Sequence, residues 1–186
     1  MITYTYELEL ELTSVISGYT NKGRINYRLV SGIPSCYYPP PPGPYTYGPP
    51  MAVAPINMVR RVVEYALTEI PREKISLGIP NYGYDWPLPY ERGTTVARTI
   101  SNLEAVRLAI DHGAEIQFDE LAMSPYFRYW QYGIEHEVWF EDVRSYKAKF
   151  DLIKEFGLTG AGYWQLMQFF RNNWLLLDDM FLIDRI

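Results

Sequence analysis

Cysteine and histidine are nearly missing from this chain of 186 residues, which has one cysteine, Cys36, and two histidines, His112 and His136. One cysteine cannot form an intrachain disulfide, so no disulfide framework holds the fold. The two histidines are far apart in the sequence, and neither has a partner at the spacing of metal ligands. No nucleophile elbow, phosphate loop or zinc motif is present. We therefore expect no metal site and no cofactor.

Basic charge and long apolar runs are also scarce. Lys and Arg number 17 against 22 Asp and Glu, a net charge of -5, whereas a nucleic-acid-binding protein would show a basic face. No apolar stretch approaches the roughly 18 residues that span a bilayer, and the first residues lack the pattern of a secretory signal. We expect neither nucleic acid nor membrane as a partner, and the compartment stays open.

Aromatic residues, in contrast, are abundant at 16% of the chain, with 17 Tyr and 5 Trp. One interpretation is a large core with many strands. The other is a sugar-binding surface, because an aromatic ring stacks on the C–H face of a pyranose. Composition alone favours the core.

The first part of the chain contains one strand pattern and one boundary. Tyr or Leu alternates with Thr or Glu over residues 4–12, which predicts a half-buried strand with its glutamates on a solvated face. Residues 13–38 show no dominant pattern. Prolines are dense at 39–50, where they cannot join a sheet ladder or a helix interior. We therefore divide the chain into an unplaced N-terminal segment, 1–38, a proline-rich linker, 39–50, and a regular part, 51–186.

Helices and strands alternate in the regular part. A capping box at Ser101 and Glu104 starts one helix, Asp142 can cap another, and Gly157 suits its end. Alternation implies parallel βα units. A complete (β/α)8 barrel of such units needs about 250 residues. This α/β segment therefore resembles the last part of a larger fold. The expected helices span 55–71, 101–113 and 142–157, with a helical tail at 170–186, and the expected strands span 75–79, 114–119, 126–132, 136–141 and 160–166.

Four segments in this order resemble the C-terminal portion of glycoside hydrolase family 18, most closely its spore-germination, cortex-lytic subgroup, called YaaH-like. The resemblance covers about residues 45–186, and four ordered matches are more specific than a lone motif. The segments are YTYGPPMAVAPI at 45–56, LGIPNYGYDW at 77–86, HEVWFEDVRS at 136–145, and GAGYWQLM with NNWLLLDD within 160–179.

The resemblance implies a partial (β/α)8 TIM barrel: strand 75–81 would be its seventh, strand 160–166 its eighth, and about 91–141 a small α+β insertion. It also implies substrate-binding roles. Trp164 matches the tryptophan that floors the subsite of the cleaved N-acetyl sugar. Tyr82 and Trp86 match the aromatic positions after the seventh strand. The ligand would be an N-acetylglucosamine-containing glycan, either peptidoglycan or chitin, in a spore or cell-wall setting.

The chain departs from the family at the catalytic residues. The family's general acid is the glutamate of a D-x-x-D-x-D-x-E motif, and the substrate's own N-acetyl group is the nucleophile. No such motif occurs in these residues, so we assign no catalytic residue here. Residues 1–44 are not recognisable as earlier barrel strands, which truncation, a frame change or a fusion would each explain.

We therefore expect a truncated, catalytically inactive form of a family 18 glycosidase that binds N-acetylated glycans weakly. One alternative is a non-catalytic carbohydrate-binding module, which needs its aromatic rings on an open face. The other is a structural or interaction protein that self-associates through exposed sheet edges.

Overall fold

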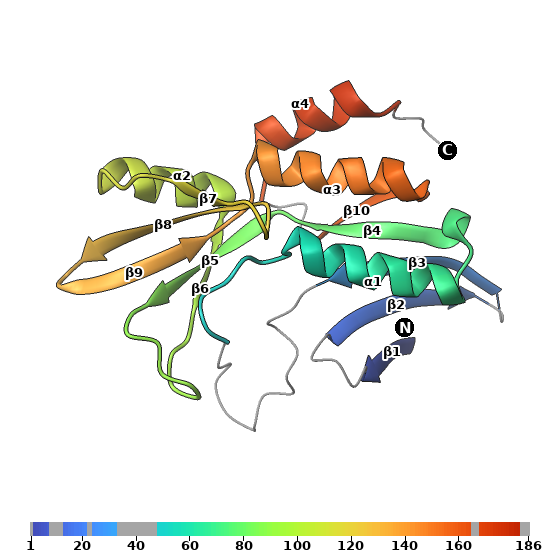
Figure 1. The fold of residues 1–186 in the computed structure, drawn as a ribbon, viewed down its shortest axis with the longest axis horizontal. Coiled ribbons are helices and arrows are strands. Elements are labelled where there is room, and N and C mark those ends of the chain that lie inside the picture. The colour runs from blue at the N-terminus through green and yellow to red at the C-terminus, as the bar shows by residue number, and fades with distance from the viewer. Residues whose placement is uncertain (1, 8–12, 22–23, 33–47, 165–167, 183–186) are drawn as a thin grey trace.

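The described part of the chain forms two open sheets and the helices that pack on them (Figure 1). The computed structural model describes residues 2–7, 13–21, 24–32, 48–164 and 168–182. The first sheet contains β1 (Ile2–Glu7), β2 (Thr13–Asn21), β3 (Arg24–Gly32), β4 (Ile75–Pro80) and β10 (Gly160–Trp164). The second contains β5 (Tyr82–Pro87), β6 (Arg98–Ser101), β7 (Gln117–Asp119), β8 (Ser124–Gln131) and β9 (Ile134–Trp139). The helices are α1 (Ile56–Glu69), the 3-10 turn η1 (Arg72–Lys74), α2 (Asn102–Asp111), α3 (Val143–Phe156) and α4 (Arg171–Met180).

The first sheet has the strand order β1-β2-β3-β4-β10. Strands β4 and β10 are parallel neighbours, as the helix–strand alternation predicts. Strand β3 lies parallel to β4 on its other side, and β2 lies between β1 and β3 and is antiparallel to both. The N-terminal segment, whose place in the fold the sequence did not predict, therefore adds strands to the sheet that contains β4 and β10.

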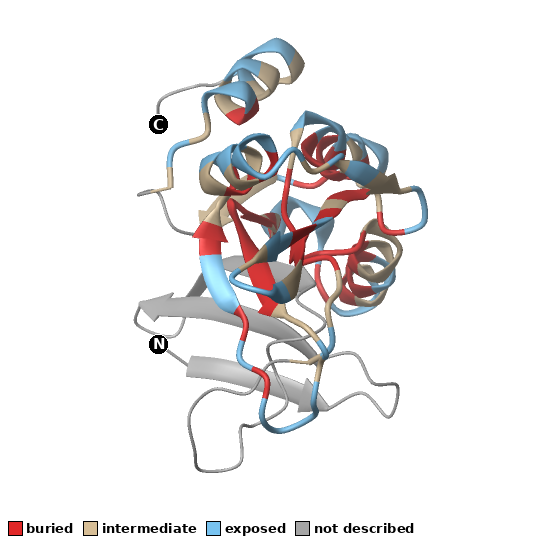
Figure 2. Ribbon diagram, turned by 90° about the vertical axis from the view of Figure 1, so that its left-hand side faces the viewer, coloured by how far each residue is buried: buried red, intermediate tan, exposed pale blue. Residues whose placement is uncertain are grey.

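One apolar core joins this sheet to α1 and α3. In β4 the side chains of Ile75, Leu77 and Ile79 are fully buried, and the apolar sides of α1 and α3 pack against them. The buried residues lie on the strands and on the sides of the helices that face them (Figure 2). Because Ile75, Leu77 and Ile79 alternate along β4, they share one face, and α1 and α3 both cover that face.

The ends of α3 are as the sequence predicts. The Asp142 side chain accepts hydrogen bonds from the backbone N–H groups of Arg144 and Ser145, which completes a capping box. At the other end Gly157 adopts a left-handed conformation with φ of 62°. Ser101 likewise accepts a hydrogen bond from the N–H of Glu104 at the start of α2.

The second sheet and α2 form a lobe with the strand order β6-β5-β9-β8-β7 (Figure 1). The predicted hairpin is present as β8 and β9. The lobe begins earlier than the expected 91–141, because β5 is its second strand. Tyr82, Tyr84 and Trp86 alternate with smaller residues, which is the period-two pattern of a strand.

Several expectations fall on residues that the structure does not describe. They are the end of the first predicted strand at 8–12, most of the proline-rich linker at 39–47, the last residues of the predicted strand 160–166, and the end of the tail at 183–186. None of the described helices combines the length and the hydrophobicity needed to cross a membrane.

Candidate functional site

The carboxyl ends of β4 and β10 form one edge, at which two of the three predicted binding residues meet. In the parallel register Trp164 is opposite Pro80, so both strands end side by side. Tyr82 follows only two residues after Pro80, at the start of β5. In α/β folds, ligands bind where parallel strands end at their carboxyl side. We call this edge, with Asn81, Tyr82 and Trp164, the strand-end site.

Asn81 connects the two segments that leave the strand-end site. Its side chain is buried, with 3% exposed, and its Nδ2 atom donates a long hydrogen bond of 3.4 Å to the carbonyl of Gln168. Gln168 follows β10 in the chain, whereas Asn81 follows β4. The contact therefore ties together the connections after both parallel strands. The indole of Trp164 lies outside the described part of the structure.

Tyr82 and Trp86 are packed among other aromatic rings in this structure. Tyr82 is 4% exposed and Trp86 is 0% exposed. The Tyr84 ring lies between them, with ring centroids 5.5 Å from each, in edge-to-face geometry. The Trp86 indole N–H also donates to the carbonyl of Gly48 at 3.0 Å. The structure thus brings Tyr82 and the backbone of Trp164 to one edge and places Trp86 in the interior of the lobe.

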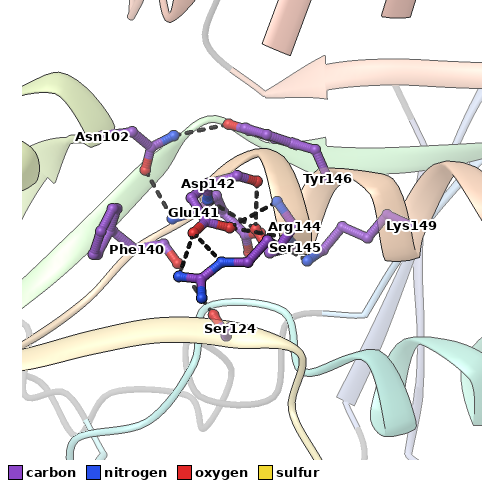
Figure 3. A network of polar contacts seen from close by, with 9 residues as sticks. All are labelled: Asn102, Ser124, Phe140, Glu141, Asp142, Arg144, Ser145, Tyr146 and Lys149. Atoms are coloured by element: carbon purple, nitrogen blue, oxygen red, sulfur yellow. Dashed lines mark hydrogen bonds and ion pairs between the residues drawn. The ribbon is translucent and has the colours of Figure 1, made fainter. Parts of the chain in front are cut away.

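A buried polar junction joins the lobe to α3 (Figure 3). Asn102, the first residue of α2, donates from Nδ2 to the Tyr146 hydroxyl at 2.8 Å and accepts at Oδ1 from the Glu141 backbone N–H at 3.0 Å. The Lys149 ammonium donates to Glu141 Oε2 at 2.8 Å. One amide side chain therefore links α2, the return connection after β9, and α3.

The ion pair in this junction is shielded from water. The side chains of Lys149 and Glu141 are 1% and 0% exposed. Burial raises the pKa of the Glu141 carboxyl, and the charge of Lys149 opposes that rise. Burial also raises the pKa of Tyr146, and the nearby Glu141 adds to the effect. Because each partner has a specific contact, the junction can fix how the lobe sits on the parallel strands.

The sequence did not lead us to expect this junction, because charged residues are usually exposed. The sequence does contain a signal for the buried lysine, which is the helical i, i+3, i+4, i+7 spacing of Tyr146, Lys149, Phe150 and Ile153. That spacing puts Lys149 on the apolar side of its helix, where a cation needs a buried partner.

A second polar cluster lies inside the lobe around Asp85, whose side chain is 3% exposed. Its carboxylate accepts from the Tyr129 hydroxyl at 2.9 Å and from Arg98 at 3.2 Å, and it contacts His136 Nδ1 at 2.9 Å. Burial, followed by the interaction with Asp85, raises the pKa of Tyr129. The cluster holds β5, β6, β8 and β9 together and uses one of the two histidines structurally.

Beside β10, Tyr163 packs against the helix that follows. Its hydroxyl donates to Asn173 Oδ1 at 3.2 Å, and its ring lies 4.8 Å from that of Trp174. Burial raises the pKa of Tyr163. Helix α4 therefore braces β10 next to the strand-end site. Among the described residues, no group of three or more His, Cys, Asp or Glu side chains is placed to hold a metal ion.

Comparison with known proteins agrees with this arrangement. The family model described as glycosyl hydrolases family 18 matches residues 45–168. The chain belongs to glycosyl hydrolases family 18. The match includes α1, the whole lobe, both parallel strands and the strand-end site, so the family resemblance carried by the four sequence segments is confirmed.

Individual known proteins are similar to about three quarters of the chain. The cortical fragment-lytic enzyme of Bacillus subtilis (strain 168) is 54% identical over 138 residues, which are 74% of this chain and 32% of the relative. The crystal structure of the spore cortex-lytic enzyme SleL of Bacillus megaterium QM B1551 is 52% identical with a TM-score of 0.72, over 75% of this chain and 33% of that one. A chitinase structure from Chromobacterium violaceum ATCC 12472 is 29% identical with a TM-score of 0.64, over 70% and 40%. The chain spans about a third of the length of the cortex-lytic relatives.

Proposed function

We propose that this chain forms the last part of a family 18 (β/α)8 barrel and binds N-acetylglucosamine-containing glycans at the strand-end site. The observation that carries the proposal is the parallel pairing of β4 and β10, which puts Trp164 and Tyr82 at one carboxyl edge. Two relatives named for lysis of the spore cortex support peptidoglycan as the glycan, and the chitinase structure supports chitin as its analogue. Trp164 contacts the sugar, and the buried Tyr82 and Trp86 support the site from within the lobe.

The expected affinity is low. One stacked sugar ring contributes on the order of 1 kcal/mol, by analogy with stacked aromatic pairs. A millimolar dissociation constant corresponds to about 4 kcal/mol, so one stacking contact with a few hydrogen bonds gives millimolar binding at best.

Titration with an N-acetylglucosamine oligomer tests the binding proposal. We expect saturable weak binding by the wild-type chain, partial binding by Trp164→Phe, and none by Trp164→Ala. Phe169→Ala is the matched control, because Phe169 is an aromatic residue 64% exposed just after β10. A thermal melt of each variant checks the fold. Unchanged binding by Trp164→Ala would contradict glycan binding at the strand-end site.

We also propose that the chain by itself does not hydrolyse the glycan. These 186 residues contain no D-x-x-D-x-D-x-E motif, and loss of a general acid typically costs about two to four orders of magnitude in rate. Assays on chito-oligosaccharides and spore-cortex glycan should show no turnover. Turnover that survives repurification and disappears in Glu9→Gln or Glu11→Gln would overturn this proposal.

A second candidate function is self-association through β10. Of the described strands, β10 pairs only with β4, which leaves its other edge open to a strand from another chain. Light scattering over a range of concentrations tests this. A mass that rises with concentration supports pairing, and a monomer throughout contradicts it.

A further inference from the structure

One side of β8 faces away from α2 and carries alternating aromatic and charged side chains. Phe127 and Tyr129 are buried against α2, so the alternating residues Tyr126, Arg128 and Trp130 lie on the opposite side of the sheet. Trp130 is 65% exposed. We call Tyr126, Arg128 and Trp130 the outer face of β8.

A depression of about 380 Å³ lies at one end of this outer face. It is lined by Tyr126, Arg128, Glu115 and Gln117. The Tyr126 ring is stacked on the Trp139 ring, with centroids 4.6 Å apart and an interplanar angle of 16°. The aromatic wall of the depression is therefore held in place by a neighbouring ring before any ligand arrives.

The polar groups beside this wall are also fixed. Glu137 accepts from Arg128 Nε at 2.8 Å and from the Trp139 indole N–H at 2.7 Å. A further carboxylate, Glu135, lies 3.8 Å from the Arg128 guanidinium. The single carboxylate of Glu137 thus orients both the cation and the ring that supports Tyr126.

The charges of this surface select against anions. Three carboxylates, those of Glu115, Glu135 and Glu137, surround one guanidinium, so a phosphate or nucleic acid would meet net repulsion. A neutral ligand rich in hydroxyl groups can instead donate to the carboxylates and stack on the rings. Aromatic rings with a few placed polar groups are the usual lining of a site for such a ligand.

Aromatic side chains connect this surface with the strand-end site. Across the sheet Trp139 is paired with both Tyr126 and Tyr84. Tyr84 in turn lies 5.5 Å from Tyr82, measured between ring centroids. A continuous row of rings therefore runs from the strand-end site to the outer face of β8.

We propose that the outer face of β8 is a second contact site for a neutral N-acetylated glycan strand, which stacks on Tyr126 and Trp130. The four residue steps from Tyr126 to Trp130 span about 13 Å of strand, enough for more than one sugar ring. This inference rests on the proposed function for the choice of ligand, but it concerns different residues. It gives the lobe a role in binding a long glycan chain that extends beyond the strand-end site.

The indole N–H signals of the five tryptophans in a ¹⁵N-labelled full chain separate the two sites. Trp130→Phe and Trp164→Phe assign the two relevant signals, and the probe is a long chito-oligosaccharide. We expect the Trp130 signal to shift saturably. Trp130→Ala should weaken that binding by about two- to tenfold, the size of one ring contact. Ile110→Ala is the control, because Ile110 is 71% exposed on α2, across the sheet.

The possible outcomes distinguish the two proposals. A shift at Trp164 with none at Trp130 overturns the second site and leaves the proposed function standing. A shift at Trp130 with none at Trp164 supports the second site and overturns the strand-end site. No shift at either position overturns both. If inorganic polyphosphate moves the Trp130 signal as the glycan does, the selection for a neutral ligand is wrong.

Discussion

At the scale of single residues, substitution of Lys149 has the clearest expected effect on the free energy of unfolding. Its ammonium and the Glu141 carboxylate are almost completely buried and 2.8 Å apart. Removing one member of such a pair leaves the other charged or forces it to neutralise, without a partner, inside the protein. The pair matters for function because it lies in the junction between the lobe and α3.

Lys149→Met should lower the free energy of unfolding by about 3–5 kcal/mol. Lys147→Met is the matched control on the same helix: Lys147 pairs with Asp151 at 2.6 Å, but it is 59% exposed, so we expect a change within about 1 kcal/mol. Adding Glu141→Leu to Lys149→Met should restore much of the loss. Urea unfolding measures all four proteins. Equal effects for the two lysines would contradict the buried pair.

At the scale of elements, the close approach of β5 to β9 holds the lobe together. A Cβ atom added at Gly83 would lie 2.5 Å from the Trp139 carbonyl oxygen and 2.7 Å from the Phe140 Cβ. These neighbours are backbone and the base of a side chain, so they cannot move aside without shifting a strand.

Gly83→Ala should therefore destabilise the protein by about 1–3 kcal/mol through overpacking. Gly160→Ala in β10 is the control, because no atom of the described residues lies within 4 Å of its added Cβ, and we expect a change below about 1 kcal/mol. Thermal unfolding compares the two. A tolerated Gly83→Ala would mean that β5 and β9 are farther apart than described.

Elements differ in how far their sequences predict them. Helix α3 was predictable at both ends, because Asp142 and Gly157 are local signals that act on adjacent backbone. Strand β5 was missed although Tyr82, Tyr84 and Trp86 alternate as in a strand, because glycine and proline interrupt the segment and its partner β9 lies about fifty residues away in the sequence. The outer face of β8 depends instead on the pairing of β8 with β9, which places Trp139 opposite Tyr126.

At the scale of the whole molecule, buried tyrosines link stability to alkaline pH. Burial raises the pKa values of Tyr129 in the lobe, Tyr146 in α3 and Tyr163 in β10. A raised pKa in the folded state means that the unfolded state loses its proton first. The stabilisation is therefore complete below the unfolded tyrosine pKa of about 10 and is lost as the pH rises through the folded values.

The free energy of unfolding should fall above about pH 10 by up to about 1.4 kcal/mol per pH unit for each tyrosine. Tyr163→Phe should make this fall less steep. Urea unfolding at several alkaline pH values measures the slope, and the ultraviolet absorbance of tyrosinate reports ionisation. A free energy of unfolding that stays constant through this range would contradict the burial of these hydroxyl groups.

The proposed function requires the carboxyl edge of β4 and β10 to contact an N-acetylated glycan. Intermolecular nuclear Overhauser effects between a bound N-acetylglucosamine oligomer and the aromatic rings detect such a contact. We expect contacts from the sugar C–H protons to the Trp164 ring, with Tyr82 close to the same sugar, and the loss of these contacts in Trp164→Ala. Sugar contacts confined to other rings, or none at saturating oligomer, would contradict it.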